Sequence, residues 1–189
     1  MDRTNTDCYI SEQNERIKLK QLDDSLWGEC IEIFNQIIEE GDSFPWDEPM
    51  TDARLQVLFA PSDAVWCAVG TDEGRDVLLG FVHIHPNNNG RCAHVANCGY
   101  CVRREARGRG VGKLLVGKSI EAAREMGFRG IQFNAVVSTN TVAVALYRRF
   151  GFEIIGAIPG GFRLGSVATG DVRYVDMYVM YKALTTFSQ

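Results

Sequence analysis

A short basic and glycine-rich run in the middle of the chain constrains the fold more than any other feature. Residues 103–113 read RREARGRGVGK and lie between a segment that alternates like a strand and a segment with helical spacing. A helix N-terminus presents unpaired N–H groups and a partial positive charge, and glycines let a phosphate approach that backbone closely. This turn from strand to helix therefore predicts a binding site for a pyrophosphate.

The hydrophobic periodicity on both sides of the run predicts one mixed α/β sheet of six to seven strands flanked by about four helices. The expected strands are residues 17–21, 65–69, 77–85, 92–102, 131–137, 152–158 and 175–181, and the expected helices are residues 25–40, 51–59, 110–126 and 140–150. A glycine-rich loop over residues 159–170 is expected to join the last two strands. Residues 1–16 are polar and lack periodicity, so we interpret them as a flexible tail and residues 17–189 as one domain.

The composition of the 189-residue chain excludes several classes of protein. With 46% hydrophobic residues, the chain can bury a core without disulfides or structural metals. Its formal net charge of −4 argues against binding along nucleic acid. The chain has no stretch of 18 apolar residues, which a membrane-spanning helix would need. Its six cysteines follow no disulfide framework. We therefore expect a cytoplasmic protein with reduced cysteines.

Two pairs of potential metal ligands lack the pattern of a metal site. Cys98 and Cys101 form a C-x-x-C motif on a predicted strand, where a spacing of three points the side chains to opposite faces. His83 and His85 share a face of their strand, but the sequence offers no third ligand. We expect no metal.

A second glycine motif overlaps the basic run and favours a different ligand. The segment GKLLVGKS from Gly112 to Ser119 satisfies the pattern of a nucleoside-triphosphate P-loop. A working P-loop follows a buried strand directly and stays irregular up to its lysine. Here Leu114, Leu115 and Val116 are strong helix formers on a helix that has already begun, so we interpret this match as false.

Two motifs one strand apart give the chain a family resemblance. Arg107, Gly110 and Gly112 fill a motif of Gln or Arg, two residues, Gly, one residue, then Gly or Ala. A second motif is filled by Asn140, Ala143, Leu146, Tyr147, Gly151 and Phe152. With both motifs, the chain resembles the GCN5-related N-acetyltransferases, which transfer an acetyl group from acetyl-CoA to an amine.

The resemblance implies a cofactor site and a general acid. It implies that acetyl-CoA is bound by Cys101, Val102, Arg107, Gly108, Arg109, Gly110, Val111, Gly112, Lys113, Asn134, Asn140 and Tyr147. Asn140 and Tyr147 are seven residues apart, about two helical turns, and so face the same side. A tyrosine hydroxyl can protonate the leaving thiolate, which is the role of a tyrosine at this position in the family. The alternative is that Tyr147 only packs on the sheet.

The remaining chemistry is less clearly marked in the sequence. No general base stands out, although His94 precedes the phosphate loop on the same strand. Cys98 or Cys101 as an acyl carrier would be a covalent alternative to direct transfer in a ternary complex.

The acceptor amine is expected to bind between two loops, residues 41–47 and 159–173. Phe44, Trp46 and Phe162 could wall this pocket, although rings around Pro45 could also merely cap the core. Asn97, a buried Asn134 and Asn140 resemble the fungal branch that acetylates proline analogues, which implies a small, amino-acid-like amine. A protein or peptide acceptor, a non-catalytic acetyl-CoA sensor, and an aminoglycoside held by Asp42, Asp47 and Glu48 stay open as alternatives. The edge of a final strand, residues 175–181, could pair two chains in a homodimer.

Overall fold

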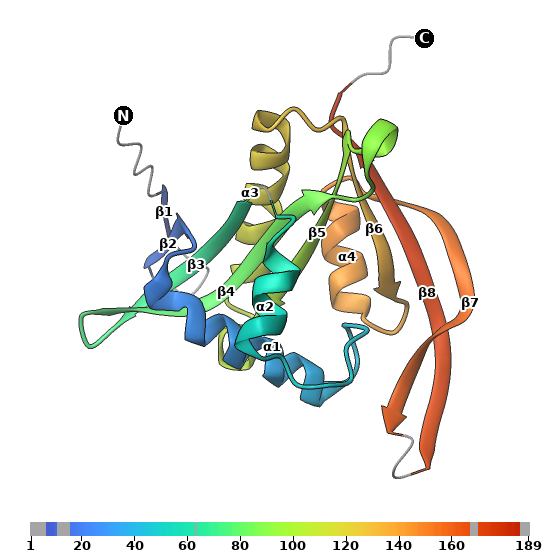
Figure 1. The fold of residues 1–189 in the computed structure, drawn as a ribbon, viewed down its shortest axis with the longest axis horizontal. Coiled ribbons are helices and arrows are strands. Elements are labelled where there is room, and N and C mark those ends of the chain that lie inside the picture. The colour runs from blue at the N-terminus through green and yellow to red at the C-terminus, as the bar shows by residue number, and fades with distance from the viewer. Residues whose placement is uncertain (1–6, 11–15, 63, 167–169, 186–189) are drawn as a thin grey trace.

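A single mixed sheet forms the centre of the molecule. The computed structural model describes residues 7–10, 16–62, 64–166 and 170–185. Among them, eight strands lie in the order β1-β2-β3-β4-β5-β6-β8-β7 (Figure 1). The strands are β1 (Asp7–Ile10), β2 (Arg16–Gln21), β3 (Ala64–Asp72), β4 (Arg75–Pro86), β5 (Val95–Val102), β6 (Gly130–Val137), β7 (Glu153–Ser166) and β8 (Asp171–Ala183). The predicted mixed α/β sheet is confirmed.

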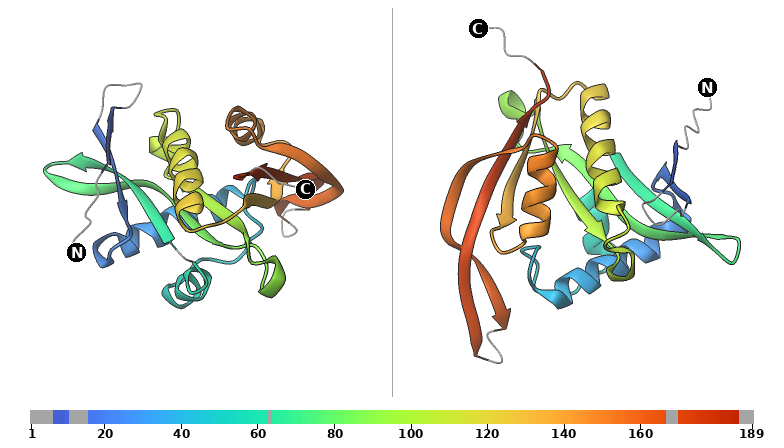
Figure 2. Two further views of the ribbon diagram at one scale, coloured as in Figure 1. Left: turned by 90° about the horizontal axis from the view of Figure 1, so that it is seen from above. Right: turned by 180° about the vertical axis from the view of Figure 1, so that it is seen from behind.

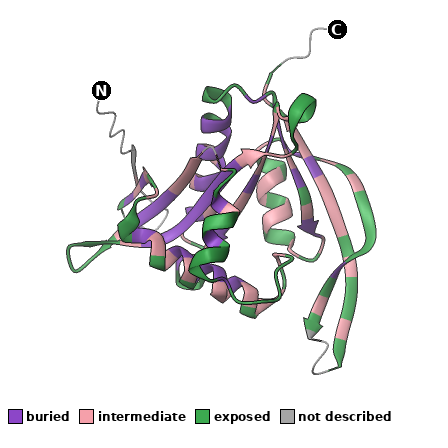
Figure 3. Cartoon of the chain, in the orientation of Figure 1, coloured by how far each residue is buried: buried purple, intermediate pink, exposed green. Residues whose placement is uncertain are grey.

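Four α-helices cover the two faces of this sheet. They are α1 (Trp27–Glu40), α2 (Asp52–Phe59), α3 (Val111–Glu125) and α4 (Thr141–Arg149). α1 and α2 lie on one face, and α3 and α4 lie on the other (Figure 2). Each face has its own buried apolar cluster, and the central strands between them are the most buried part of the chain (Figure 3). None of the helices formed by the described residues is long and apolar enough to cross a membrane.

Local sequence signals explain where the first two helices begin and end. Asp23 accepts a hydrogen bond from the backbone N–H of Ser25 and starts the 3-10 turn that leads into α1. α1 ends at Gly41, whose φ of 64° is the left-handed conformation that glycine adopts without strain. The hydroxyl of Thr51 caps α2 by accepting from the N–H of Arg54. The caps at Gly41 and Thr51 fix the two ends of the loop between α1 and α2.

The pairing of β5 with β6 differs from the other pairings among the described strands. These two strands run parallel, whereas the other neighbours are antiparallel. Their register contains two residue pairs, Val95 with Gly130 and Ala96 with Ile131. Beyond these pairs the two strands separate, which opens a gap in the middle of the sheet.

Three details differ from the sequence-based expectations. Asp7–Ile10, expected within the tail, pairs with β2 as strand β1; the rest of the tail before Arg16 lies outside the described residues. The expected loop over residues 159–170 is mostly strand, because β7 continues to Ser166 and stays paired with β8 through an irregular stretch between Ile158 and Phe162. β8 is not an edge strand, because it lies between β6 and β7, and β7 forms that edge. A homodimer through residues 175–181 is therefore not supported at that position.

Candidate active site

The gap between β5 and β6 exposes strand backbone in the middle of the sheet. After Ala96, no residue of β5 pairs with β6 in the described register. Residues 97–102 therefore offer their β6-facing backbone groups to an extended ligand, as a sheet edge offers them to an added strand. Cys101 and Val102, two of the predicted acetyl-CoA contacts, belong to this segment.

The start of α3 lies directly beyond this gap and is suited to an anion. β5 leads into α3 through the 3-10 turn Arg104–Ala106 and two glycines with left-handed backbone, Gly108 (φ 75°) and Gly110 (φ 83°). Gly110 is the N-cap of α3 and has no side chain to cap the first turn. The N–H groups that begin at Val111 are therefore directed toward the space in front of the helix.

A carboxylate links the predicted phosphate loop, residues 103–113, to the end of α1. Glu40 accepts hydrogen bonds from Arg104 and Arg107, each at 2.7 Å. Burial raises the pKa of the Glu40 carboxyl, but the hydrogen bonds from Arg107 and then Arg104 outweigh it, and the net shift is downward. The predicted phosphate-binding Arg107 is thus held in place from the α1 side, in contact with a residue that also lines a cleft described below.

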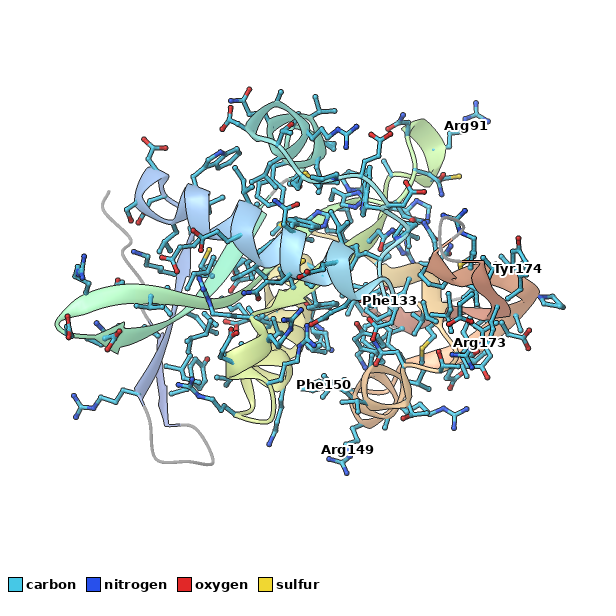
Figure 4. The ribbon with its side chains drawn as sticks, turned by 90° about the horizontal axis from the view of Figure 1, so that it is seen from below. Arg91, Phe133, Arg149, Phe150, Arg173 and Tyr174 are labelled. Carbon is cyan, nitrogen blue, oxygen red and sulfur yellow. The ribbon has the colours of Figure 1, made fainter. Side chains whose placement is uncertain are left out.

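Tyr147 lies on α4 against the aromatic part of the core. Its ring centroid is 4.5 Å from that of Phe133 and 5.7 Å from that of Tyr100. Figure 4 shows Phe133 beside α4, and Phe150 between α4 and α3. Burial is the main cause that raises the pKa of Tyr147, so its phenol keeps its proton at neutral pH. Tyr147 therefore packs on the sheet and is also in the protonation state of a general acid.

Asn140 has a structural role in the same helix. Its side-chain oxygen accepts a hydrogen bond of 3.1 Å from the N–H of Ala143, which makes it the N-cap of α4. This contact directs the side-chain oxygen of Asn140 toward α4, and the cap fixes the start of the helix that carries Tyr147.

The two cysteines of the C-x-x-C motif lie on opposite faces of β5, as the strand spacing predicts. Cys98 belongs to the apolar cluster under α3, and Cys101 belongs to the cluster under α1 and α2. Burial raises the pKa of Cys98 to about 12 and also raises that of Cys101. Both side chains are therefore thiols rather than thiolates, which disfavours either as an acyl carrier.

A cleft on the α1 side brings together three of the four predicted acceptor residues. Its volume is about 880 Å³, and its lining includes Phe44, Trp46 and Phe162. Asp47 and Arg163 form an ion pair of 3.1 Å that joins the loop after α1 to β7. The fourth predicted residue, Asn97, lies on β5 and is absent from the lining.

Asn134 is exposed, and the expectation that it is buried is wrong. Its side of β6 is open to solvent, where its amide donates to Asn87 (2.7 Å) and accepts from Gln132 (2.9 Å). Phe133 packs under α4, so the neighbouring Asn134 points to the opposite face, toward the side of α1 and α2. Asn97 precedes Cys98 and takes that same face of β5.

Two histidines share this face and were not assigned to the site from the sequence. His83 and His85 lie on β4 with their rings stacked, 5.4 Å between centroids and 14° between planes. The H-x-H spacing predicts a shared face, but only the sheet register shows that His85 is opposite Asn97. His94, the base considered from the sequence, is exposed and lies before β5 begins.

Comparison with known proteins agrees with the fold and the motifs. The acetyltransferase (GNAT) family model matches residues 28–152. N-acetyltransferase aca1 of Schizosaccharomyces pombe is 29% identical over 185 residues, which cover 91% of this chain and 85% of aca1. The solved structure of a GCN5-related N-acetyltransferase from Kribbella flavida superposes with a TM-score of 0.78 at 34% identity, covering 88% of this chain and 97% of that chain.

A further relative matches a shorter segment. The L-methionine sulfoximine/L-methionine sulfone acetyltransferase of Pseudomonas aeruginosa is 41% identical over 58 residues, 31% of this chain and 33% of that protein.

Proposed function

Because the chain belongs to the acetyltransferase (GNAT) family, we propose that it transfers the acetyl group of acetyl-CoA directly to the amine of a small, amino-acid-like molecule. The observation that carries this proposal is the gap between β5 and β6 directly before the uncapped start of α3. A long ligand with a pyrophosphate at one end and an amide-containing arm at the other fits both features.

The residues around this gap have separable roles. When bound, acetyl-CoA supplies an acetyl group that is activated as a thioester. The N–H groups at Val111, Gly112 and Lys113 hold the pyrophosphate, and the open backbone of Cys101 and Val102 binds the arm that follows it. Tyr147 keeps its proton until negative charge develops on the sulfur and then donates it.

Two observations support a small acceptor. The cleft beside Glu40 is lined by aromatic rings and by the Asp47–Arg163 ion pair, which suits a compact polar molecule. The relative from Pseudomonas aeruginosa is named for two small amino-acid derivatives.

The free thiols at Cys30, Cys67, Cys92, Cys98 and Cys101 support a cytoplasmic location.

The proposal is tested by calorimetric titration of acetyl-CoA, followed by a free-thiol release assay over amino acids, proline analogues, polyamines, aminoglycosides and peptides. We expect acetyl-CoA to bind and a small amine to release thiol. Turnover with peptides alone would move the acceptor class to proteins, and binding without turnover on any amine would favour a sensor. A protein that does not bind acetyl-CoA would contradict the proposal.

A further inference from the structure

Two stacked imidazoles face the acceptor side of the sheet. The ring of His83 lies 5.5 Å from that of Phe59 on α2, and the alternation of β4 places His85 on the same face. Tyr147 packs under α4 on the opposite face. The gap between β5 and β6 therefore has a phenol on one side of the sheet and the imidazole pair on the other.

The sheet register places His85 at the point where the strands separate. His85 pairs with Asn97, and Asn97 is the first residue of β5 beyond the last β5–β6 pair. Asn134, on the other side of the gap, bonds to Asn87, two residues after His85. His85, Asn97 and Asn134 thus lie around the closed end of the gap, where β5 and β6 separate, on the face of the sheet that α1 and α2 cover.

The ring of His83 is buried beside β5 in its neutral state. Its side chain is 4% exposed, and its Nδ1 has no hydrogen-bond partner among the described residues. Burial, together with the neighbouring His85, lowers the pKa of His83 to about 3, so the ring is neutral at neutral pH. Its Nε2 lies so close to Gly99 that a Cβ there would clash at 2.1 Å. A glycine at this position of β5 is what leaves room for the imidazole.

The hydrogen bond of His85 defines which of its nitrogens is basic. Its Nδ1 lies 2.9 Å from the carbonyl oxygen of Pro86. A carbonyl oxygen can only accept, so Nδ1 carries the proton and donates it. In the neutral ring the lone pair is therefore at Nε2. The side chain of His85 is only partly buried, so a ligand can reach it.

Resting on the proposed acetyl transfer, we propose that His85 Nε2 is the proton acceptor for the substrate amine. It takes one proton from the ammonium group, and the freed lone pair forms the C–N bond as the C–S bond of the thioester breaks. Tyr147 donates its proton to the sulfur, and the second amine proton leaves to solvent, which reprotonates the phenol. The balance is one ammonium and one thioester giving one amide, one thiol and one proton, which His85 releases to water.

The test compares His85→Ala and His85→Asn with wild type in the thiol-release assay. Asparagine can still donate to the Pro86 carbonyl but has no basic nitrogen, so it separates the proposed role from a local structural one. We expect kcat/KM to fall by about 10² to 10⁴ in both variants, with acetyl-CoA affinity unchanged. Two further readouts should depend on proton transfer. Free imidazole should restore part of the activity of His85→Ala, and the loss should shrink for a weakly basic amine that is already neutral at the assay pH.

Several outcomes would overturn the proposal. These are full activity in His85→Asn, a loss that is equal for strongly and weakly basic amines and insensitive to imidazole, and an imidazole-rescued loss in His94→Ala instead. If wild type binds acetyl-CoA and turns over while His85→Asn does the same, the inference alone fails. If wild type turns over no amine at all, the proposed function fails and the inference falls with it.

Discussion

At the scale of single residues, Tyr147 is the side chain on which the proposed chemistry depends most. Its ring is packed against Phe133 and Tyr100, and burial raises the pKa of its phenol above the usual range. A raised pKa suits a group that must donate a proton at neutral pH and regain it from solvent afterwards. The same packing that stabilises α4 thus keeps the phenol in the protonation state that the proposed role requires.

We predict that Tyr147→Phe lowers kcat by about 10² to 10⁴ and leaves acetyl-CoA affinity nearly unchanged, because only the donated proton is lost. Steady-state thiol release and calorimetry measure the two effects. Tyr100→Phe is the matched control, since the Tyr100 hydroxyl bonds to Ser119 at 2.7 Å. That variant should lose about 1 kcal/mol of unfolding free energy but keep its turnover. Wild-type turnover in Tyr147→Phe would place the acid elsewhere.

At the scale of elements, the two ends of α3 offer a controlled comparison. Gly110 precedes the helix with φ 83°, and Gly127 follows it with φ 85°; a Cβ at either would meet no atom within 4 Å. An L side chain is therefore strained by a similar amount at both positions, but only Gly110 faces the proposed pyrophosphate.

We predict that Gly110→Asp weakens acetyl-CoA binding at least tenfold, about 1.4 kcal/mol, because it adds bulk and negative charge where the phosphates lie. Gly127→Asp should lower the Tm by about as much as Gly110→Asp does, because the backbone strain is similar. It should not change the affinity for acetyl-CoA. Calorimetric titration and thermal unfolding of both variants measure these effects. Equal affinities in the two variants would refute the assignment of the phosphate loop.

The contact between α1 and the phosphate loop predicts a pH-dependent stability. The folded-state pKa of Glu40 is lowered, so its stabilising contribution is present above the unfolded carboxyl pKa of about 4.3 and is lost as the pH falls through the folded value. Glu40→Gln should therefore lower the Tm at neutral pH, and the difference from wild type should vanish in acid. Glu39→Gln is the control, since Glu39 is highly exposed and lies 3.7 Å from Arg104. A difference that persists unchanged in acid would contradict this account.

Much of the element pattern could be predicted from the sequence because it depends on local signals. The change of periodicity after residue 102 and the glycines at 108 and 110 predict the strand, turn and helix that form the proposed phosphate site. The long β7 could not be predicted, because its glycines and proline are typical of loops and its pairing with β8 supplies the order. The expected burial of Asn134 is wrong because the sequence does not show which face of β6 is covered. The relation of His85 to the gap depends on the register of β4 with β5, which only the folded sheet provides.

At the scale of the whole molecule, the sheet separates the two halves of the proposed site. The side of α3 and α4 carries Tyr147, and the side of α1 and α2 carries His85 and the aromatic cleft. In the proposed reaction, both reactants are therefore present at once and meet through the gap between β5 and β6. Such an arrangement favours direct transfer, because no side chain needs to store the acetyl group between them.

We predict that initial-rate lines intersect when acetyl-CoA and the amine are both varied, as a ternary complex requires. Mass spectrometry of the protein incubated with acetyl-CoA alone should show no acetyl group on Cys98 or Cys101, since burial keeps both side chains as thiols. Parallel lines, together with an acetyl adduct on either residue, would establish a covalent route instead.

Acetyl-CoA is proposed to bind in the gap between β5 and β6 and at the start of α3. Amide hydrogen exchange with and without acetyl-CoA, read by mass spectrometry, tests this placement. We predict that exchange slows in residues 97–113 and changes little in β2 and β3, which lie on the far side of β4. Slowing confined to other segments, or none at saturating acetyl-CoA, would contradict the account.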